Sequence, residues 1–184
     1  LVQLTGKSVV LFPIAFHMNR APKSWSNIKS MIQVAQLRQQ RHPGYACTSA
    51  VNTAISIRLG NPPDRLFWSG LQTYQDIRML VKKIKKRRIP GVAMDASIDF
   101  FGYSIGAFFS MILLMANPEG YFADTKLFAF CGGTTLDRTF PISKYILDSH
   151  GGHTLNSYYS EQLHNYFQAS PRLAHYMDRH EGEN

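Results

Sequence analysis

The least polar part of this chain, residues 98–116, most constrains what it can fold into. The segment reads IDFFGYSIGAFFSMILLMA, and residues 102–106 within it spell G-x-S-x-G around Ser104. Its length is close to the roughly 20 apolar residues that a membrane-spanning helix needs. Three interpretations are therefore open: a membrane span, an ordinary buried helix that contains serine and glycine, and a serine on a sharp turn between a strand and a helix.

The residues around the motif favour the third interpretation. A membrane span would carry Asp99 near one end, with two glycines and a serine within five positions. By chance, G-x-S-x-G arises in roughly one chain in twenty of this length, given that glycine is about 7% of residues. Here, however, the β-favouring Ile98, Phe100 and Phe101 precede the motif and an uninterrupted apolar stretch follows it. This is the strand–turn–helix context in which the motif presents a nucleophilic serine.

The two glycines and the helix that follows have a chemical explanation. A serine on such a turn brings neighbouring backbone segments close together, so side chains at Gly102 and Gly106 would clash. Ser104 would then stand at the N-terminus of a helix. There the backbone N–H of Ile105 and the helix dipole can stabilise an oxyanion.

Strand-like and helix-like segments alternate along the chain. Helical patterns occupy residues 28–40, 69–88 and 105–116, and each is followed by proline or glycine. Apolar runs of strand length occur near residues 9–16, 49–57, 98–101 and 127–130. This alternation predicts an α/β fold in which a mostly parallel sheet of at least four strands is flanked by helices.

A run of cations, KKIKKRR at residues 82–88, accounts for much of the net charge of +8. Ser69 and Gln72 form a capping-box pattern, and apolar residues then recur on one helical face. The run is therefore expected to end that helix, where cations complement the helix dipole. No aromatic or base-reading motif accompanies the charge, so we expect no nucleic acid partner.

Size and cysteine content limit the remaining classes. A chain of 184 residues can bury one good core, so we expect a single domain or part of one. Cys47 and Cys131 form no C-x-x-C pair, which predicts a fold without disulfides. The chain begins at Leu1 without a signal-type segment, so we expect a cytoplasmic protein that is part of a longer chain. We expect neither a cofactor nor a metal ion.

Several segments together resemble the α/β-hydrolase superfamily. FFGYSIGAF resembles its nucleophile elbow, with Ser104 as the nucleophile. VVLFPIAF followed by HMNRAP is similar to the strand and loop that supply the second oxyanion donor. His17-Met18 stands where His-Gly is usual, so that donor would be the backbone N–H of Met18 or Asn19. With FCGG and SKYILDS, residues 8–149 resemble an uncharacterised bacterial group with the hydrolase fold, classed as a domain of unknown function.

The resemblance also implies a catalytic acid and a histidine after the serine, in that chain order. The candidate acids are Asp137, which follows a predicted strand end, and Asp148. His153 follows two glycines, as the catalytic histidine often does in this superfamily, and is preferred to His164. Further histidines in this region are His150 and His175. Residues 1–135 would form the hydrolase core and residues 136–184 a C-terminal cap-like segment, and His17 would orient the oxyanion loop or contact substrate.

Two functions remain open at this point. The first is a serine hydrolase that cleaves a small-molecule ester, thioester or amide through an acyl-enzyme on Ser104. The second is a hydrolase-fold module that is incomplete or catalytically inactive and serves in binding. In that case the acid and histidine of the triad would be missing from this chain.

Overall fold

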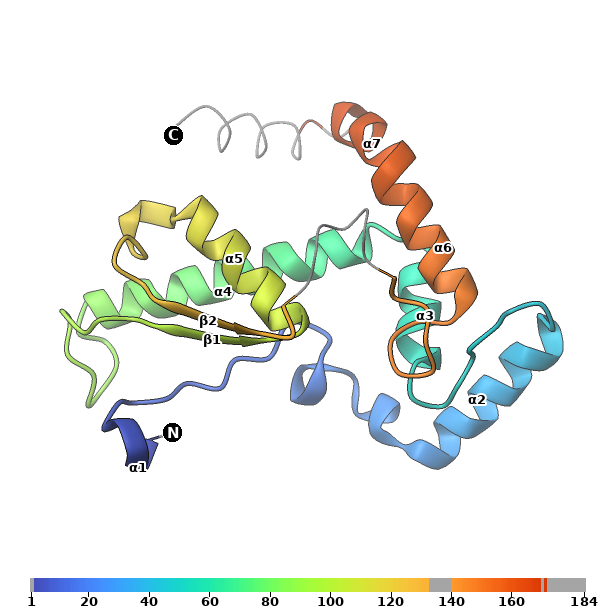
Figure 1. Cartoon of the computed structure of the whole chain (residues 1–184), viewed down its shortest axis with the longest axis horizontal. Coiled ribbons are helices and arrows are strands. Elements are labelled where there is room, and N and C mark those ends of the chain that lie inside the picture. Colours follow the sequence, from blue (N-terminus) through green and yellow to red (C-terminus); the bar gives the residue numbers. More distant parts are fainter. Residues whose placement is uncertain (1, 133–139, 170, 172–184) are drawn as a thin grey trace. The chain divides into compact units, whose positions relative to one another are not determined.

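The structure is a computed structural model that describes residues 2–132, 140–169 and residue 171 (Figure 1). The chain divides into two compact units. Unit 1 contains Leu1–Ala21 and Phe67–Gly133, and unit 2 contains Pro22–Leu66 and Thr134–Asn184. The chain passes from one unit to the other at 21–22, at 66–67 and at 133–134. The division into a hydrolase core of residues 1–135 and a cap-like segment of residues 136–184 is a different division and stays a prediction.

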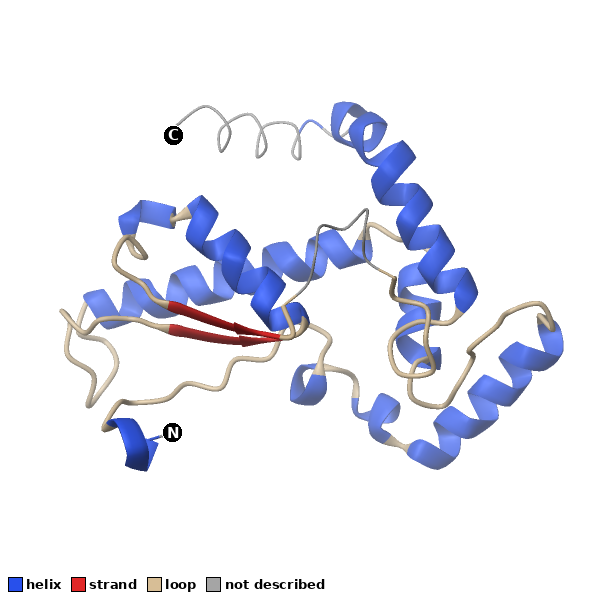
Figure 2. Cartoon of the chain, viewed as in Figure 1, coloured by secondary structure: helices blue, strands red, loops and turns tan. Residues whose placement is uncertain are grey.

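Unit 1 contains a small parallel sheet (Figure 2). Strand β1 (Phe100–Tyr103) pairs with β2 (Leu127–Phe130), so that Phe100 lies opposite Leu127 and Tyr103 opposite Phe130. Helix α5 (Ile105–Ala116) connects the strands and packs against both of them. The structure therefore confirms the predicted α/β class. It also confirms the strand predicted at residues 127–130 and, with a shift of two residues, the strand predicted at residues 98–101.

The other two predicted strands are wrong for the described residues. Residues 9–16 form no regular element, and Val9, Val10 and Leu11 are largely exposed. Residues 49–57 instead lead into helix α3 (Thr53–Gly60), which buries Thr53, Ser56 and Leu59 on one face. Short apolar runs cannot separate strand from helix, and here the three-residue spacing of buried positions decides for helix.

Helix α4 (Arg65–Lys85) provides the second helical layer of unit 1. Ser69 lies inside this helix and is buried, so the predicted capping box is wrong and the helix begins four residues earlier. The helix ends in the cationic run as expected, with Lys82, Lys83 and Lys85 in its last turn. There the cations face the negative end of the helix dipole.

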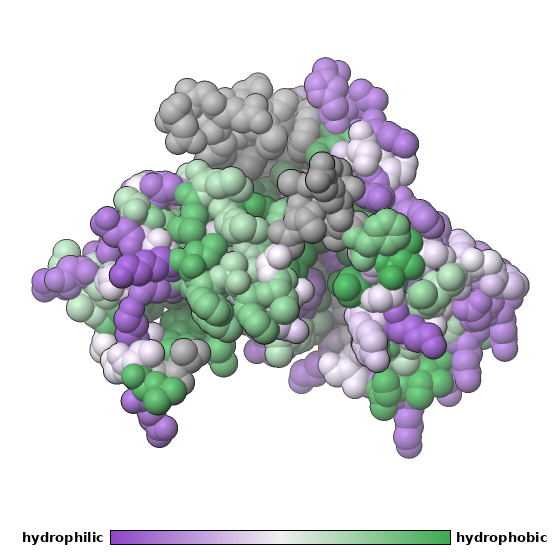
Figure 3. All heavy atoms as spheres, in the orientation of Figure 1, coloured by the Kyte–Doolittle hydropathy of each residue, from purple (hydrophilic) through white to green (hydrophobic). Residues whose placement is uncertain are grey.

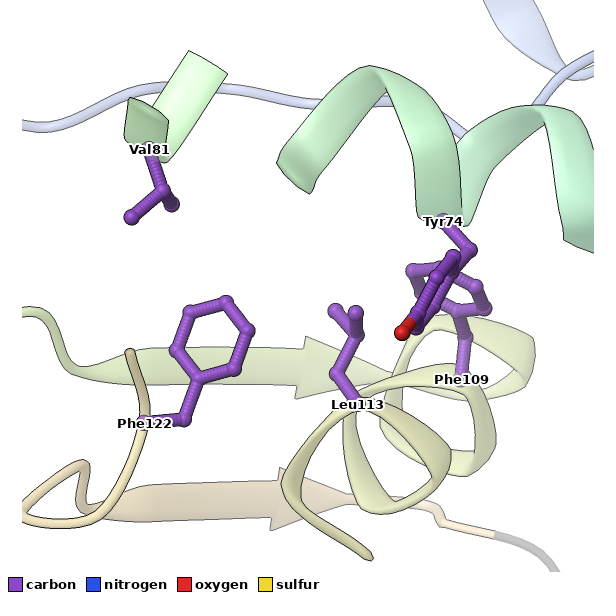
Figure 4. Close-up of a cluster of buried hydrophobic side chains, with 5 residues drawn as sticks. All are labelled: Tyr74, Val81, Phe109, Leu113 and Phe122. Carbon is purple, nitrogen blue, oxygen red and sulfur yellow. The ribbon is translucent and has the colours of Figure 1, made fainter. Parts of the chain in front are cut away.

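The core of unit 1 lies between α4, α5 and one face of the sheet. Figure 4 shows its five buried side chains: Tyr74 and Val81 come from α4, Phe109 and Leu113 from α5, and Phe122 from the loop before β2. Further apolar side chains pack around these five, among them Ile14, Leu71, Ile77, Ile98 and Phe100. The predicted apolar helix after the G-x-S-x-G motif thus serves as a core helix of unit 1.

The opposite face of the sheet is aromatic and exposed. Phe101 stacks on Phe128, and Tyr103 stacks on Phe130, with ring centroids 5.5 and 5.8 Å apart. All four side chains are at least half exposed. Figure 3 shows hydrophobic residues, in green, gathered over the part of unit 1 that contains the sheet and α5.

Unit 2 is helical in its described part. Its helices are α2 (Ile28–Arg41), α3, α6 (Ser149–Ser157) and α7 (Leu163–Ala169), with a π-helical turn at Tyr158–Gln162 between the last two. The predicted helix at residues 28–40 is confirmed, and Asn27 caps it by accepting a hydrogen bond from the Ser30 N–H at 3.1 Å. Leu59, Leu147 and Leu155 form the core of this unit.

The described residues also contain four short helices: α1 (Val2–Thr5), η1 (Met18–Arg20), η2 (Lys23–Ser26) and η3 (Pro118–Gly120). Among the described residues, no helix combines the length and the apolar character that crossing a membrane requires. The apolar α5 itself ends at Ala116, where Asn117 adopts a left-handed conformation with φ 32°. Most of residues 98–116 therefore forms a strand, a turn and a helix of 12 residues rather than one continuous helix.

Candidate active site

Ser104 occupies the turn between β1 and α5 in a rare backbone conformation. Its φ is 52° and its ψ is −121°, outside the regions that L-residues normally populate. The turn is fixed on both sides, because the Ser104 N–H donates to the Phe130 carbonyl at 2.9 Å and the Ser104 carbonyl accepts from the Ala107 N–H at 2.9 Å. The predicted positive φ on a strand-to-helix turn is confirmed.

The Ser104 side chain is free for chemistry. The residue is exposed, and although it stands at the N-cap position of α5, its hydroxyl makes no capping hydrogen bond. N-cap serines ordinarily accept a hydrogen bond from the second or third helical N–H. A strained backbone that turns the hydroxyl away from this default partner is typical of functional positions.

Of the two motif glycines, only Gly102 lies where a side chain would clash with neighbouring atoms. A Cβ at Gly102 would lie 2.5 Å from the Ala107 Cα and 2.9 Å from the Gly106 carbonyl oxygen, so β1 and the first turn of α5 touch through backbone. A Cβ at Gly106 would meet nothing within 4 Å. The expectation that a side chain at Gly106 would clash is therefore wrong.

This difference predicts opposite effects for two matched substitutions. Gly102→Ala should destabilise the protein by about 3 kcal/mol, because backbone atoms must move to admit the methyl group. Gly106→Ala, in the first turn of α5, should be neutral or stabilise by up to about 1 kcal/mol through helix propensity. Urea unfolding of both variants measures the difference, and equal stabilities would contradict the packing seen at the turn.

Backbone N–H groups suited to an oxyanion occur on two segments of unit 1. Ile105 is the first residue of α5, so its N–H has no partner within the helix and lies at the positive end of the helix dipole. Met18 and Asn19 open the η1 turn, where Met18 has φ 48°. Neither of their N–H groups has a hydrogen-bond partner among the described residues.

The loop that carries Met18 is anchored to α4. The Ala15 N–H donates to the Thr73 hydroxyl at 3.0 Å, in a buried position. Arg20 forms an ion pair with Asp76 and also donates to the Pro13 carbonyl at 3.0 Å. These contacts hold residues 13–20 in one place, which an oxyanion donor requires. The sequence gives no indication that Thr73 and Asp76 anchor this loop, because both lie more than fifty residues from it.

Of the two candidate acids, Asp148 is the one that lies among the described residues. Asp137 lies outside the described residues, as does His175. Asp148 is fully buried in unit 2, where it caps α6 by accepting from the Gly151 N–H at 2.9 Å. Its carboxylate also accepts from Arg38 at 2.6 Å, through Nε, and at 3.3 Å, through Nη2. Asp148 thereby joins α2 to α6 and is already satisfied by these partners.

The candidate histidines after the motif also belong to unit 2. His153 is exposed on α6, and His164 lies on α7, where its Nε2 is 2.9 Å from the Gln168 side-chain nitrogen. Ser104 belongs to unit 1. The pairing of Ser104 with His153 and an acid therefore stays a prediction.

His150 stands in an aromatic stack beside the Asp148 ion pair. The rings of His42, Tyr45 and His150 stack with both successive centroid distances at 4.6 Å, and the Arg38 guanidinium lies 4.9 Å from the Tyr45 centroid. Burial lowers the pKa of His150 below its usual value of 6.5, and Arg38 and His42 lower it further while Asp148 opposes them. The folded protein therefore favours neutral His150.

A lowered histidine pKa predicts a specific loss of stability in mild acid. Below pH 6.5 the unfolded chain binds a proton at His150 more readily than the folded chain does. The contribution of neutral His150 to the free energy of unfolding is therefore fully present above pH 6.5 and is lost as the pH falls below it. Thermal unfolding from pH 7.5 to pH 5 should show a shallower decline for His150→Phe, which keeps a ring in the stack. Identical declines in both proteins would contradict this assignment.

Comparison with known proteins adds a family but no activity. No curated protein and no solved structure matches the chain. One family model matches residues 1–183, which is nearly the whole sequence, and it is described as a family of unknown function (DUF6051). The uncharacterised group expected from the sequence is thus supported, and membership in the α/β-hydrolase superfamily stays a proposal. The chain belongs to the DUF6051 family.

Proposed function

We propose that the protein is a serine hydrolase of the α/β-hydrolase type, which cleaves an ester, thioester or amide of a small acyl substrate through an acyl-enzyme on Ser104. The observation that carries the proposal is the conformation of Ser104, with φ 52° and ψ −121°, on a turn whose backbone contacts leave no room for a side chain at Gly102. A strained strand-to-helix turn of this kind exposes a single hydroxyl at the edge of a sheet.

The surrounding groups support the chemistry of acyl transfer. In the proposed mechanism the Ser104 hydroxyl attacks the carbonyl carbon while a histidine takes its proton. The N–H of Ile105, together with that of Met18 or Asn19, would stabilise the negative charge that develops on the carbonyl oxygen. The acyl group then remains on Ser104 until water hydrolyses it, as in other serine hydrolases.

The proposed triad adds a histidine and an acid to Ser104. The sequence prefers His153 as the base and names Asp137 or Asp148 as its acid. The buried contacts of Asp148 with Arg38 and Gly151 support a structural role for this carboxylate. This role leaves Asp137 as the candidate acid of the proposed triad, if the triad follows the chain order of the superfamily.

A binding module without catalysis is the second candidate function. Its support is the exposed aromatic face formed by Phe101, Tyr103, Phe128 and Phe130. Apolar surface of this kind marks interaction sites more often than ordinary surface. This function requires no histidine near Ser104, so covalent labelling of the serine separates the two candidates.

A fluorophosphonate probe provides that test, because it reacts only with a serine whose proton is removed by a working base. The hydrolase proposal predicts that the probe labels the wild-type protein on the peptide containing Ser104, and that Ser104→Ala abolishes the labelling. Ser110, which lies in α5 and donates to the Gly106 carbonyl at 2.8 Å, is the matched control for a helix serine. Ser110→Ala should label normally. Absence of labelling in folded wild-type protein would favour the binding module.

A further inference from the structure

The positive charge of unit 1 is concentrated in residues 82–95. This segment contains six lysines and arginines and one acid, Asp95, so it carries a net charge of +5. The rest of unit 1 contains four lysines and arginines and four acids, so its net charge is zero. Three of those four cations, Lys7, Arg20 and Arg78, form ion pairs with three of the acids. The excess charge of unit 1 therefore comes from this one segment.

The six cations of the segment have no carboxylate bound to them. Within the part of the chain that the structure describes, none of them forms an ion pair. Lys85 is half-buried and donates to the Ala96 carbonyl at 3.3 Å, and the other five are exposed. A hydrogen bond from Arg78 is the main cause that lowers the pKa of Glu119, and Lys82 adds a smaller Coulombic contribution. Five exposed charges of one sign therefore lie together at the end of α4.

The chain leaves α4 through an arginine in a conformation that suits glycine. The Arg88 N–H donates to the Lys83 carbonyl and the Arg87 N–H to the Ile84 carbonyl, both at 2.9 Å, which is the Schellman pattern. In this pattern the residue at the position of Arg87 is left-handed, here with φ 54°, and is usually glycine. Cations near the end of a helix complement its dipole, but the dipole does not require an arginine in place of this glycine. The charge is present at a cost to stability, which indicates a use beyond the fold.

Two exposed methionines border these cations. Met79 lies one turn before the first cations on α4 and is 53% exposed. Met94 is 41% exposed and lies on the loop between α4 and β1, where its sulfur is 2.9 Å from Nε of Arg87. Figure 1 shows this loop at the end of α4. Residues 79–95 include no aromatic side chain on which a nucleic acid base could stack.

We propose that unit 1 docks on an anionic phospholipid surface through this end of α4. The cationic surface consists of the five exposed cations at residues 82, 83 and 86–88, with Met79 and Met94 at its border. Clusters of four to eight lysines and arginines on an amphipathic helix are attracted to anionic lipids, and exposed apolar side chains beside them reach the headgroup region. This inference does not depend on the proposed hydrolase function.

The contacts of α4 determine how the protein would bind such a surface. The apolar face of the helix is buried in the core of unit 1, where Tyr74 and Val81 lie. The helix therefore cannot insert that face into a membrane while unit 1 is folded. Binding is then mainly electrostatic, and it should weaken strongly as salt shortens the Debye length from about 10 Å at 0.1 M to about 3 Å at 1 M.

Co-sedimentation of the full chain with lipid vesicles tests the proposal. Vesicles that mix phosphatidylcholine with phosphatidylserine should bind the protein at low salt and release it at high salt, and vesicles of phosphatidylcholine alone should not bind it. Each cation near an anionic surface contributes about fivefold in affinity, so the triple variant Lys82→Gln, Lys83→Gln, Lys86→Gln should bind about 100-fold more weakly. Circular dichroism checks that this variant is folded.

A second triple variant is the matched control. Lys23→Gln, Lys29→Gln and Arg41→Gln remove the same charge from exposed positions of unit 2 and should leave vesicle binding at the wild-type level. An equal loss in both triple variants, or unchanged binding in the first, would overturn the proposal. Tighter binding to double-stranded DNA than to the mixed vesicles, lost in the first variant, would also overturn it and assign the surface to nucleic acid.

Arg87→Gly separates binding from the ending of the helix. Glycine fits the left-handed position, so the urea midpoint of this variant should be at or above that of the wild-type protein. Vesicle binding should fall about fivefold, because one cation is lost. A lower urea midpoint together with unchanged binding would overturn the part of Arg87 in the cationic surface.

Discussion

Ser104→Ala should reduce hydrolysis of small p-nitrophenyl esters to the background rate of the buffer. The substitution removes the proposed nucleophile, and the proposed oxyanion donors cannot form an acyl-enzyme without it. Stability should change by less than about 0.5 kcal/mol, because the side chain is exposed and makes no capping hydrogen bond. We therefore expect Ser104→Ala to lose ester hydrolysis and to keep the free energy of unfolding of the wild-type protein.

Ser104→Gly adds a test of the strain at the same position. Non-glycine residues in such conformations cost about 1–3 kcal/mol, and glycine adopts them freely. After the entropy that glycine adds to the unfolded chain, of about 0.4–1 kcal/mol, this variant should be more stable than wild type by about 1 kcal/mol. Urea unfolding measures the difference. A glycine variant that is less stable than the alanine variant would contradict the strained turn.

Asp148→Ala should cause the largest loss of stability among single substitutions in unit 2. It leaves Arg38, whose side chain is only 11% exposed, without its carboxylate partner, and it removes the N-cap of α6. Breaking a buried ion pair by removing one partner costs about 3–5 kcal/mol. Hydrogen exchange should then show faster exchange in α2, α3 and α6, while α5 in unit 1 keeps its protection.

Glu119→Ala is the matched control for this experiment. Glu119 pairs with Arg78, and both side chains are more than 30% exposed. Exposed ion pairs contribute about 0–1 kcal/mol, so this variant should unfold close to the wild-type protein. If Asp148→Ala is no less stable than Glu119→Ala, then Asp148 does not join α2 to α6 in the way described.

Features that depend on a few adjacent residues could be predicted from the sequence. The helix at residues 28–40 has a capping asparagine before it and His42-Pro43-Gly44 after it, and it was found within one residue. The turn at Ser104 was predicted because β-favouring residues, two glycines and an apolar helix follow one another directly. In both cases the local preferences and the final packing agree.

Features that depend on distant partners could not be predicted in this way. The apolar run at residues 9–16 predicts a buried strand. In the structure this segment is fixed instead by an ion pair between Lys7 and Asp99 and by a hydrogen bond from the Ala15 N–H to the Thr73 hydroxyl. Both partners are distant in the sequence, so residues 9–16 alone give no indication of them. The segment before Leu59 read as a strand because Ile55 and Ile57 are β-favouring. Burial of the polar Thr53 and Ser56 inside unit 2, where the Ser56 hydroxyl accepts from the Asp148 N–H, overrides that preference.

The candidate site shows the same division. Ser104 and the N–H of Ile105 follow from one contiguous motif, whereas the structural role of Asp148 depends on Arg38, 110 residues away. The chain order of the superfamily therefore names Asp148 as a candidate acid, and nothing in that order indicates that Arg38 already binds its carboxylate. The half-buried His17 was recognised as part of the oxyanion loop, but its hydrogen bond to Ala15 depends on how the loop folds.

The most direct test of the hydrolase proposal is to trap the acyl-enzyme. The wild-type protein is mixed with p-nitrophenyl acetate, quenched with acid within the burst of p-nitrophenol release, digested and mapped by mass spectrometry. The proposal predicts an acetyl group on the peptide that contains Ser104, present after short reaction times and absent in Ser104→Ala. An acetyl group on another residue, or p-nitrophenol release that continues unchanged in Ser104→Ala, would contradict it.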